Sequence, residues 1–368
     1  MRLRGRVVTP TRVVEDGEVR VEGNRIVAVG RARSAKTAEA TWILPGFVDI
    51  HVHGGGGHSF TSGDPAAARE AARFHLRHGT TTMLASLVTA PLKTIRKSTV
   101  DLRPLIEDGT IHGLHYEGPY LSAKRCGAQN PDHLRDPNPR ELEKLLDLGG
   151  VRMVTVAPEL PRALETIRLL GQRGVIAAIG HTDASYDQTM AGIQAGATVG
   201  THVCNGMRPV HHREPGPVVA LLDAPTVVCE QIPDGVHLHD GMLRHAIQTA
   251  GPDRIALITD AIDAAGMTDG HYDLGGQAVR VEQGVARLER DGAIAGSTLT
   301  MAAGLRRTVQ SGVSIVDASR MASGTPARAL GLQHELGSLT AGRRADLVLL
   351  DDELTVTGVL RGGVAYPA

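Results

Sequence analysis

Two histidines stand one residue apart at the end of an apolar run, directly before four glycines. They are His51 and His53 in the stretch PGFVDIHVHGGGG. Side chains two residues apart on a β-strand point to the same face, so the two imidazoles would lie side by side. A divalent metal ion would hold both rings in the neutral form and use them as ligands. Two loop histidines without a ligand fit this stretch equally well, so the rest of the chain must decide.

Four more histidine and carboxylate residues follow short β-branched runs farther along the chain. Glu117 occurs in HYEGPY, His181 in IGHTDAS, His202 in GTHVCNGM and Asp260 in LITDA. Taken singly, Asp260 could be a helix cap and Glu117 a solvated loop residue. Together with the first pair they form a donor set that suits one or two divalent metal ions. Zinc, iron, manganese and cobalt all accept nitrogen and oxygen ligands, so the sequence leaves the identity of the metal open.

Eight short runs must position these residues, and we expect each run to be a strand. The runs are 46–51, 80–86, 111–116, 152–157, 175–180, 198–203, 226–229 and 255–259. Helical segments separate most of them; the clearest has Asp64 as N-cap, Pro65 at its first position and Gly79 past its end. This alternation predicts an α/β fold, a (β/α)8 TIM-like barrel with its active site at the C-terminal strand ends. A doubly wound sheet fits the same alternation.

The two ends of the chain differ from the middle, because they read as short strands and turns without helices. We therefore expect a small β-sandwich domain formed by both chain termini, residues 1–44 with 331–368. Residues 45–330 would form the barrel. Within them the stretch HYDLGGQAVRVEQGVARLERDG breaks the alternation and predicts a β-hairpin insert near 271–291.

The composition excludes several classes of partner. The 368 residues carry a formal net charge of -1 and only 2% aromatic residues, so neither nucleic acid nor an anionic membrane is an expected partner. The three cysteines form no C-x-x-C pair, which fits a reducing compartment. The N-terminus lacks the apolar core of a signal peptide, and we expect a cytoplasmic protein.

Several motifs, in this order, resemble the N-acetylglucosamine-6-phosphate deacetylase family of the amidohydrolase superfamily. They are HYEGPYL, GHTDAS, THVCNGM, HHREPG, DGVHLHDG, TDA and AGSTLTM, and the match covers nearly the whole chain. The resemblance implies a metal-dependent enzyme that hydrolyses the N-acetyl group of N-acetylglucosamine 6-phosphate to glucosamine 6-phosphate and acetate. It also implies a homodimer.

The resemblance assigns a role to each candidate residue. Glu117, His181 and His202 match the principal metal ligands, while His51 and His53 match a pair that creates a second metal position in many members. Asp260 matches the catalytic aspartate of the metal site. Contacts to the sugar phosphate are implied for Ala128, Gln129, Asn205, Gly206, Arg213, His237, Ile294, Ala295 and Gly296. Arg213, with His212 beside it, is expected to act across the dimer interface at the neighbour's phosphate site.

Three positions depart from the family pattern. Gln129 replaces a histidine that polarises the substrate carbonyl, and its amide can donate a hydrogen bond there but carries no charge. Gly206 and Pro233 stand where alanine is usual, and Gly206 is expected to loosen the sugar pocket. Two alternatives therefore stay open: a deacetylase of N-acetylgalactosamine 6-phosphate, and a catalytically weak homologue that only binds sugar phosphates. An esterase reading of the glycines at 54–57 fails because no G-x-S-x-G motif is present.

Overall fold

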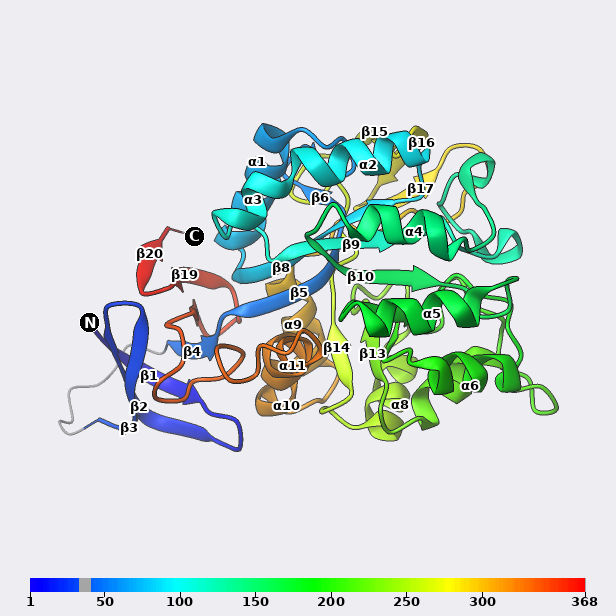
Figure 1. Ribbon diagram of the computed structural model, residues 1–368. Helices are drawn as coiled ribbons and strands as arrows, with labels where there is room; N and C mark the ends of the chain where they lie inside the picture. Colours follow the sequence, from blue (N-terminus) through cyan, green and yellow to red (C-terminus); the bar gives the residue numbers. More distant parts are fainter. Residues whose placement is uncertain (33–40, 368) are drawn as a thin grey trace.

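The computed structural model of the protein describes residues 1–32 and 41–367. Eight parallel strands form one sheet in which each strand pairs with the next in chain order (Figure 1). They are β5 (Phe47–Val52), β8 (Thr80–Val88), β9 (Gly113–Glu117), β10 (Val151–Val156), β11 (Ile176–Ile179), β12 (Val199–Gly200), β13 (Val228–Gln231) and β14 (Ile255–Leu257). A doubly wound sheet would reverse its strand order part-way, so the predicted barrel is confirmed and the alternative is excluded.

Hydrogen bonds just beyond the paired strands bring the first and eighth strands of the barrel together. The Asp260 N–H donates to the carbonyl of His51 at 2.9 Å, and the His53 N–H donates to that of Ala261 at 2.8 Å. Below them the Thr259 hydroxyl donates to the buried carboxylate of Asp49 at 2.6 Å. These bonds place Asp260 directly beside the two histidines that follow the first strand.

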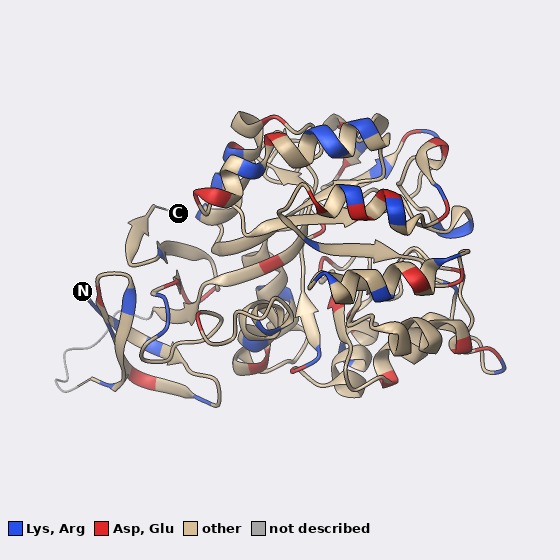
Figure 2. Ribbon diagram, in the orientation of Figure 1, with Lys and Arg blue, Asp and Glu red and all other residues tan. Residues whose placement is uncertain are grey.

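Helices cover the outside of the barrel, as Figure 1 shows. The predicted first helix is confirmed as α1 (Pro65–Arg77): the Asp64 side chain accepts a hydrogen bond from the Ala66 N–H, and Gly79 follows at φ +95°. The other α-helices are α2 (Leu92–Asp101), α3 (Arg103–Glu107), α4 (Pro139–Leu146), α5 (Ala163–Gln172), α6 (Tyr186–Ala195), α7 (Gly216–Asp223), α8 (Asp240–Ala250), α9 (Met301–Gln310), α10 (Ile315–Ser319) and α11 (Thr325–Ala329). Two 3-10 helices, η1 (Ala123–Arg125) and η2 (Pro131–His133), and a π-helix, η3 (Arg320–Gly324), are the remaining helical elements of the described residues. Both basic and acidic residues lie on the outer helices (Figure 2).

Strands from both chain ends share one seven-stranded sheet, which confirms the expected small β-domain. Its order is β20 (Val364–Tyr366), β19 (Val356–Arg361), β18 (Leu347–Leu350), β4 (Trp42–Pro45), β1 (Arg2–Val8), β2 (Val13–Glu22) and β3 (Arg25–Arg31). Its blue and red strands lie together beside the barrel in Figure 1. We keep 1–44 and 331–368 as the proposed limits of this domain; residues 33–40 and 368 lie outside the described residues.

The insert after the eighth strand has one strand more than expected. It is a three-stranded antiparallel sheet of β15 (Gly270–Leu274), β16 (Gln277–Glu282) and β17 (Val285–Leu288). Gln283 and Gly284, at φ +52° and +73°, turn the chain into the third strand. The expected hairpin is therefore formed by β15 and β16, and β17 adds a third strand after the Gln-Gly turn, which is a weaker turn signal than the Gly-Gly before it.

The barrel interior has a polar layer on top of an apolar one. One buried cluster draws on seven of the eight strands through Val48, Leu84, Met153, Ala178, Val199, Val228 and Ala256. Side chains two residues farther along a strand point to the same side, which puts Ser86, Thr155 and Glu230 directly above Leu84, Met153 and Val228. These polar side chains are fully buried beneath the C-terminal rim.

The loop that follows the first barrel strand contains two short strands and packs against α1. Strands β6 (Gly54–Gly55) and β7 (His58–Ser59) pair with each other, and the His75 ring on α1 bonds to the carbonyl of Gly54 at 2.7 Å. The glycine-rich loop is thus held against the barrel. None of the helices among the described residues is long and apolar enough to cross a membrane.

Candidate metal centre and active site

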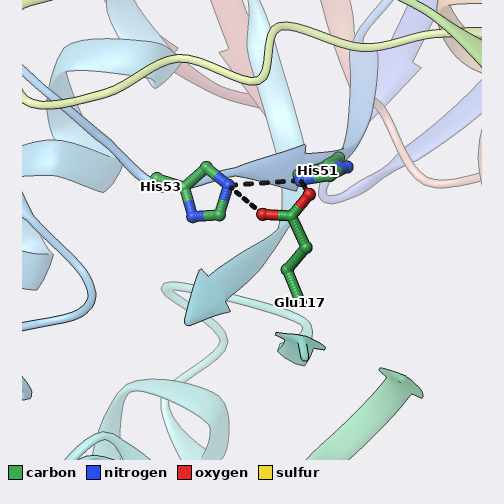
Figure 3. Close-up of side chains that lie close together, drawn as sticks. All are labelled: His51, His53 and Glu117. Atoms are coloured by element: carbon green, nitrogen blue, oxygen red, sulfur yellow. Dashed lines mark hydrogen bonds and ion pairs between the residues drawn. The ribbon is translucent and has the colours of Figure 1, made fainter. Parts of the chain in front are cut away.

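Glu117, at the end of β9, lies at the centre of four histidines. Its Oε1 is 2.9 Å from His202 Nε2, 3.0 Å from His181 Nε2 and 3.4 Å from His51 Nε2. Its Oε2 is 3.2 Å from His53 Nε2. Figure 3 shows the carboxylate between the rings of His51 and His53, which come from the C-terminal end of β5. One carboxylate oxygen therefore faces three of the histidines, and the other oxygen faces the fourth.

Asp260 joins the same cluster from the eighth strand. Its Oδ1 is 3.1 Å from His53 Nε2 and 3.4 Å from His51 Nε2. Three overlapping sets of donors each have their atoms within 4.8 Å of one another: His51, His53 and Glu117; His51, His202 and Asp260; Glu117, His181 and His202. The structure thus brings together all six residues that the sequence analysis selected.

Three of these residues have an unusual backbone conformation. The φ angles of His181, His202 and Asp260 are +46°, +27° and +50°. Residues other than glycine rarely adopt this left-handed region, which costs roughly 1–2 kcal/mol for each residue. Such strain clusters at functional sites, where it aims a side chain that ordinary strand geometry would turn elsewhere.

The hydrogen bonds around the rings fit a metal site. His53 Nδ1 donates to the Ser86 carbonyl at 3.2 Å, and His181 Nδ1 donates to the Arg125 carbonyl at 2.9 Å. A carbonyl can only accept, so each Nδ1 carries a proton, and in the neutral ring the Nε2 lone pair faces the cluster. This tautomer is the one that metal-ligating histidines adopt when an outer partner holds the other nitrogen. The donors therefore fit a divalent cation at their centre.

The electrostatics of the cluster favour positive charge at its centre. Burial alone would lower the pKa of His51 and His53, but Glu117 and Asp260 outweigh it; the pKa of His51 lies well above its ordinary value, and that of His53 is raised to about 9. Burial alone would raise the pKa of Glu117 and Asp260, but the surrounding histidines hold both values below the ordinary range. Both carboxyl groups are therefore ionised near neutral pH, and protons or a metal cation can supply the matching charge.

A pocket of about 240 Å³ opens above the cluster. Most of the expected substrate contacts line it, namely Ala128, Gln129, Asn205, Gly206, His237, Ile294 and Gly296. Ala295 is fully buried next to the last two. Arg213 lies exposed on the loop between β12 and α7 and is not part of the pocket of its own chain. Its guanidinium contacts the His212 ring at 2.8 Å.

Two glycines let the backbone approach the cluster closely. A Cβ on Gly206, at φ +57°, would lie 2.8 Å from His181 Nδ1. A Cβ on Gly296, at φ +58°, would lie 2.8 Å from the Asp260 carbonyl oxygen. Gly206 therefore does more than widen the pocket, because an alanine in this backbone conformation would press on the His181 ring.

Gln129 is tied to the cluster through both ends of its amide. Its Nε2 donates to Glu117 Oε2 at 2.5 Å, and its Oε1 accepts from the Thr89 N–H at 2.7 Å. The side chain is nearly fully buried, and its amide group keeps a second N–H that no contact within the described residues uses. Gln129 thus orients Glu117 and can still offer one hydrogen to a carbonyl in the pocket.

We predict that Gln129→Ala lowers kcat/KM by about tenfold, since a hydrogen bond to a charged group is worth roughly 1.5–3 kcal/mol and part of that orients Glu117. Gln129→His should leave activity unchanged or raise it. Gln129→Glu should be the most damaging of the three, because it sets a second carboxylate against Glu117. Steady-state kinetics with circular dichroism as the folding control checks this order, and a fully active Gln129→Glu protein would refute it.

Several residues that support the cluster were not selected from the sequence. Glu230 accepts a hydrogen bond from His51 Nδ1 at 3.0 Å, and Asp234 accepts one from His237 Nδ1 at 2.7 Å. His115 packs on His51 with ring centroids 4.5 Å apart and bonds to the hydroxyls of Ser86 and Thr155. A buried carboxylate within an apolar strand, as in VVCEQ, is the one sign that could have pointed to Glu230.

Comparison with known proteins places the chain in one protein family. Residues 42–365 match the amidohydrolase family. The N-acetylglucosamine-6-phosphate deacetylase of Lysinibacillus sphaericus is 36% identical over 333 residues, covering 88% of this chain and 84% of that protein. The N-acetylgalactosamine-6-phosphate deacetylase of Escherichia coli O157:H7 is 37% identical over 359 residues, covering 95% of each chain.

Among solved structures, a mutant N-acetyl-D-glucosamine-6-phosphate deacetylase from Mycobacterium smegmatis, in complex with N-acetyl-D-glucosamine-6-phosphate, matches with a TM-score of 0.96. The two chains are 46% identical, and the match covers 99% of this chain and 98% of that one. The similarity therefore extends over both the barrel and the small domain.

Proposed function

Because the chain belongs to the amidohydrolase family, we propose that it is a metal-dependent deacetylase that converts N-acetylglucosamine 6-phosphate into glucosamine 6-phosphate and acetate. The single observation that carries this proposal is the convergence of four histidines, Glu117 and Asp260 at the floor of one pocket. A protein that only bound sugar phosphates would have no use for such a set of donors, so the weak-homologue alternative has little support.

We propose that Glu117, His181 and His202 hold one divalent cation, and that His51 and His53 with Glu117 and Asp260 hold a second. When bound, such a cation polarises the amide carbonyl and lowers the pKa of water, which is the chemistry that a poor electrophile such as an amide needs. The nature of the metal stays open, because nitrogen and oxygen donors suit several ions.

Asp260 is the proposed general base and acid. The low pKa of its buried carboxyl group keeps it ionised near neutral pH, so that it can accept a proton from the attacking water. The same carboxyl group then returns the proton to the departing amine, which makes the nitrogen a good leaving group. Its Oδ1 lies toward His53 at 3.1 Å, which fixes the carboxylate at the floor of the pocket.

His237 and Asn205 are the proposed contacts to the sugar. The Asp234 carboxylate accepts the Nδ1–H of His237 at 2.7 Å, which leaves the Nε2 of that ring free for a hydrogen bond in the pocket. The Asn205 side chain bonds to the His202 carbonyl at 3.2 Å, so the metal cluster and the sugar contact are held together. Both residues line the pocket.

N-acetylgalactosamine 6-phosphate is the second candidate substrate, since the similarity to the Escherichia coli enzyme covers 95% of this chain. The test is a comparison of kcat/KM for both phosphorylated sugars and for unphosphorylated N-acetylglucosamine. We expect N-acetylglucosamine 6-phosphate to be the best of the three. A higher kcat/KM for the galactosamine derivative would select the alternative, and no acetate from either phosphate would refute both.

We further propose a cytoplasmic homodimer in which the exposed Arg213 reaches the phosphate site of the neighbouring subunit. Asp260→Asn and Arg213→Ala proteins should each be nearly inactive alone. If Arg213 acts in trans, a mixed dimer has one site with both defects and one with neither, so mixing should recover up to about half of the wild-type activity for each mixed dimer. Acetate release after proven subunit exchange measures the recovery.

A control pair makes the result specific. Asp260→Asn mixed with His237→Ala should recover nothing, because His237 lines the pocket of its own chain and every site keeps a defect. An Arg213→Ala mixture that behaves like this control, or an active enzyme that is strictly monomeric, would end the proposal of action in trans.

A further inference from the structure

Glu230 lies beneath the candidate metal centre and contacts two of its histidines at once. It is on the seventh barrel strand, and its side chain is completely buried. Its Oε2 accepts a hydrogen bond from His51 Nδ1 at 3.0 Å and a second one from the backbone N–H of His202 at 3.1 Å. One carboxylate oxygen therefore links a ring from the first strand to the strained backbone that follows the sixth strand.

The contact between Glu230 and His51 Nδ1 determines which nitrogen of the His51 ring faces the cluster. A carboxylate can only accept, so His51 Nδ1 must carry a proton, and it is Nε2 that offers a lone pair once the ring is neutral. That Nε2 faces His53 Nε2 at 3.2 Å and lies 3.4 Å from both Glu117 Oε1 and Asp260 Oδ1. Without an acceptor below, the proton could move to Nε2, and His51 would then be unable to ligate a cation.

Nothing else within the described part of the chain can replace this acceptor. Glu230 is the one group there that bonds to His51 Nδ1. His115 packs against the ring but uses its own nitrogens for the hydroxyls of Ser86 and Thr155. Asp49 bonds to the backbone N–H of His51 at 3.2 Å rather than to the ring.

We propose that Glu230 is a positioning residue that makes His51 a ligand of a second divalent cation, and that it secures His202 for the first. This inference rests on the proposed metal-dependent function and adds a residue that neither touches substrate nor ligates metal. Outer partners of this kind typically change metal affinity by about 10–100-fold when they are replaced.

The test is a titration of the metal-free protein with Co²⁺, followed by the visible absorption of the bound ion. The wild-type protein should take up two equivalents. Glu230→Gln keeps an oxygen that can accept both hydrogen bonds but removes the charge. The second equivalent should therefore bind about 10–100-fold more weakly, while the affinity for the first stays the same.

A second variant and a control separate positioning from general damage. Glu230→Met removes the acceptor altogether, so the second equivalent should be lost and the first weakened, because the His202 N–H loses its partner. Gln231→Met on the same strand is the matched control. Gln231 is also fully buried, and its amide has no hydrogen-bond partner among the residues that the structure describes, so both equivalents should bind as in the wild type.

If Glu230→Gln binds both equivalents of Co²⁺ as tightly as the wild-type protein does, the inference is overturned. A wild-type protein that binds only one equivalent would overturn it as well. If Glu230→Met fails to fold, Glu230→Gln alone decides. The proposed function fails separately: a wild-type protein that takes up two equivalents but releases no acetate would refute the deacetylase and leave the role of Glu230 standing.

Discussion

Asp260→Asn is expected to lower kcat by about 10²–10⁴-fold, the usual effect of losing a positioned general base. The amide matches the carboxylate in size, so the pocket should keep its shape and the substrate should still bind. The buried carboxyl group, 3.1 Å from His53, has no substitute in the cluster, because Glu117 is surrounded by histidine rings and Gln129. Stopped-time acetate assays give kcat, and calorimetric titration gives substrate affinity.

The matched control for this variant is Asp263→Asn. Asp263 follows three residues later on the same loop but does not line the pocket. Its replacement should leave kcat within about twofold, as is usual for substitutions away from the reacting groups. Near-normal turnover in Asp260→Asn would move the base to another group and contradict the assigned role.

Removal of bound metal should also lower turnover strongly. Chelation followed by dialysis is expected to reduce turnover to about a hundredth or less of its starting value, because no side chain in the pocket can polarise the amide as strongly as a divalent cation. Added zinc, manganese, cobalt or iron(II) should restore activity. Elemental analysis on the same samples shows whether activity follows metal content.

The stripped protein should also be less stable. A ligand present at 100 times its dissociation constant stabilises the native state by about 2.7 kcal/mol, so the thermal midpoint should fall on chelation and return when metal is added back. Calorimetry measures this shift. A chelated protein that is free of metal yet fully active would remove the metal from the mechanism.

The architecture was accessible from the sequence because its signals are local. Each barrel strand is a short β-branched run, and the first helix carries its own cap in Asp64 and Pro65. The order of the eight strands then follows from the rule for alternating strands and helices. The third strand of the insert was not expected because the turn before it places Gln283 in the left-handed conformation, which glutamine rarely adopts and which the sequence therefore does not indicate.

The convergence of the six cluster residues was equally accessible, since each follows an expected strand and the C-terminal strand ends of a barrel meet at one rim. The supporting layer was not. Glu230 and His115 look like polar residues that happen to fall within apolar strands, and only the closed barrel brings them under His51. The positive φ angles of His181 and Asp260 belong to the same class, because strain is set by the surrounding fold and not by the residue itself.

In the proposed reaction, the pocket directs water to the acetyl carbonyl of an N-acetyl sugar phosphate. The most direct measurement is turnover of N-acetylglucosamine 6-phosphate by the metal-loaded protein in water enriched in ¹⁸O, with both products analysed by mass spectrometry. Attack at the acetyl carbonyl predicts equal amounts of acetate and glucosamine 6-phosphate, with one ¹⁸O atom in the acetate and no more label in the sugar phosphate than glucosamine 6-phosphate kept in the same water acquires at its anomeric oxygen. Intact substrate after metal loading, or label in the sugar phosphate instead of the acetate, would contradict it.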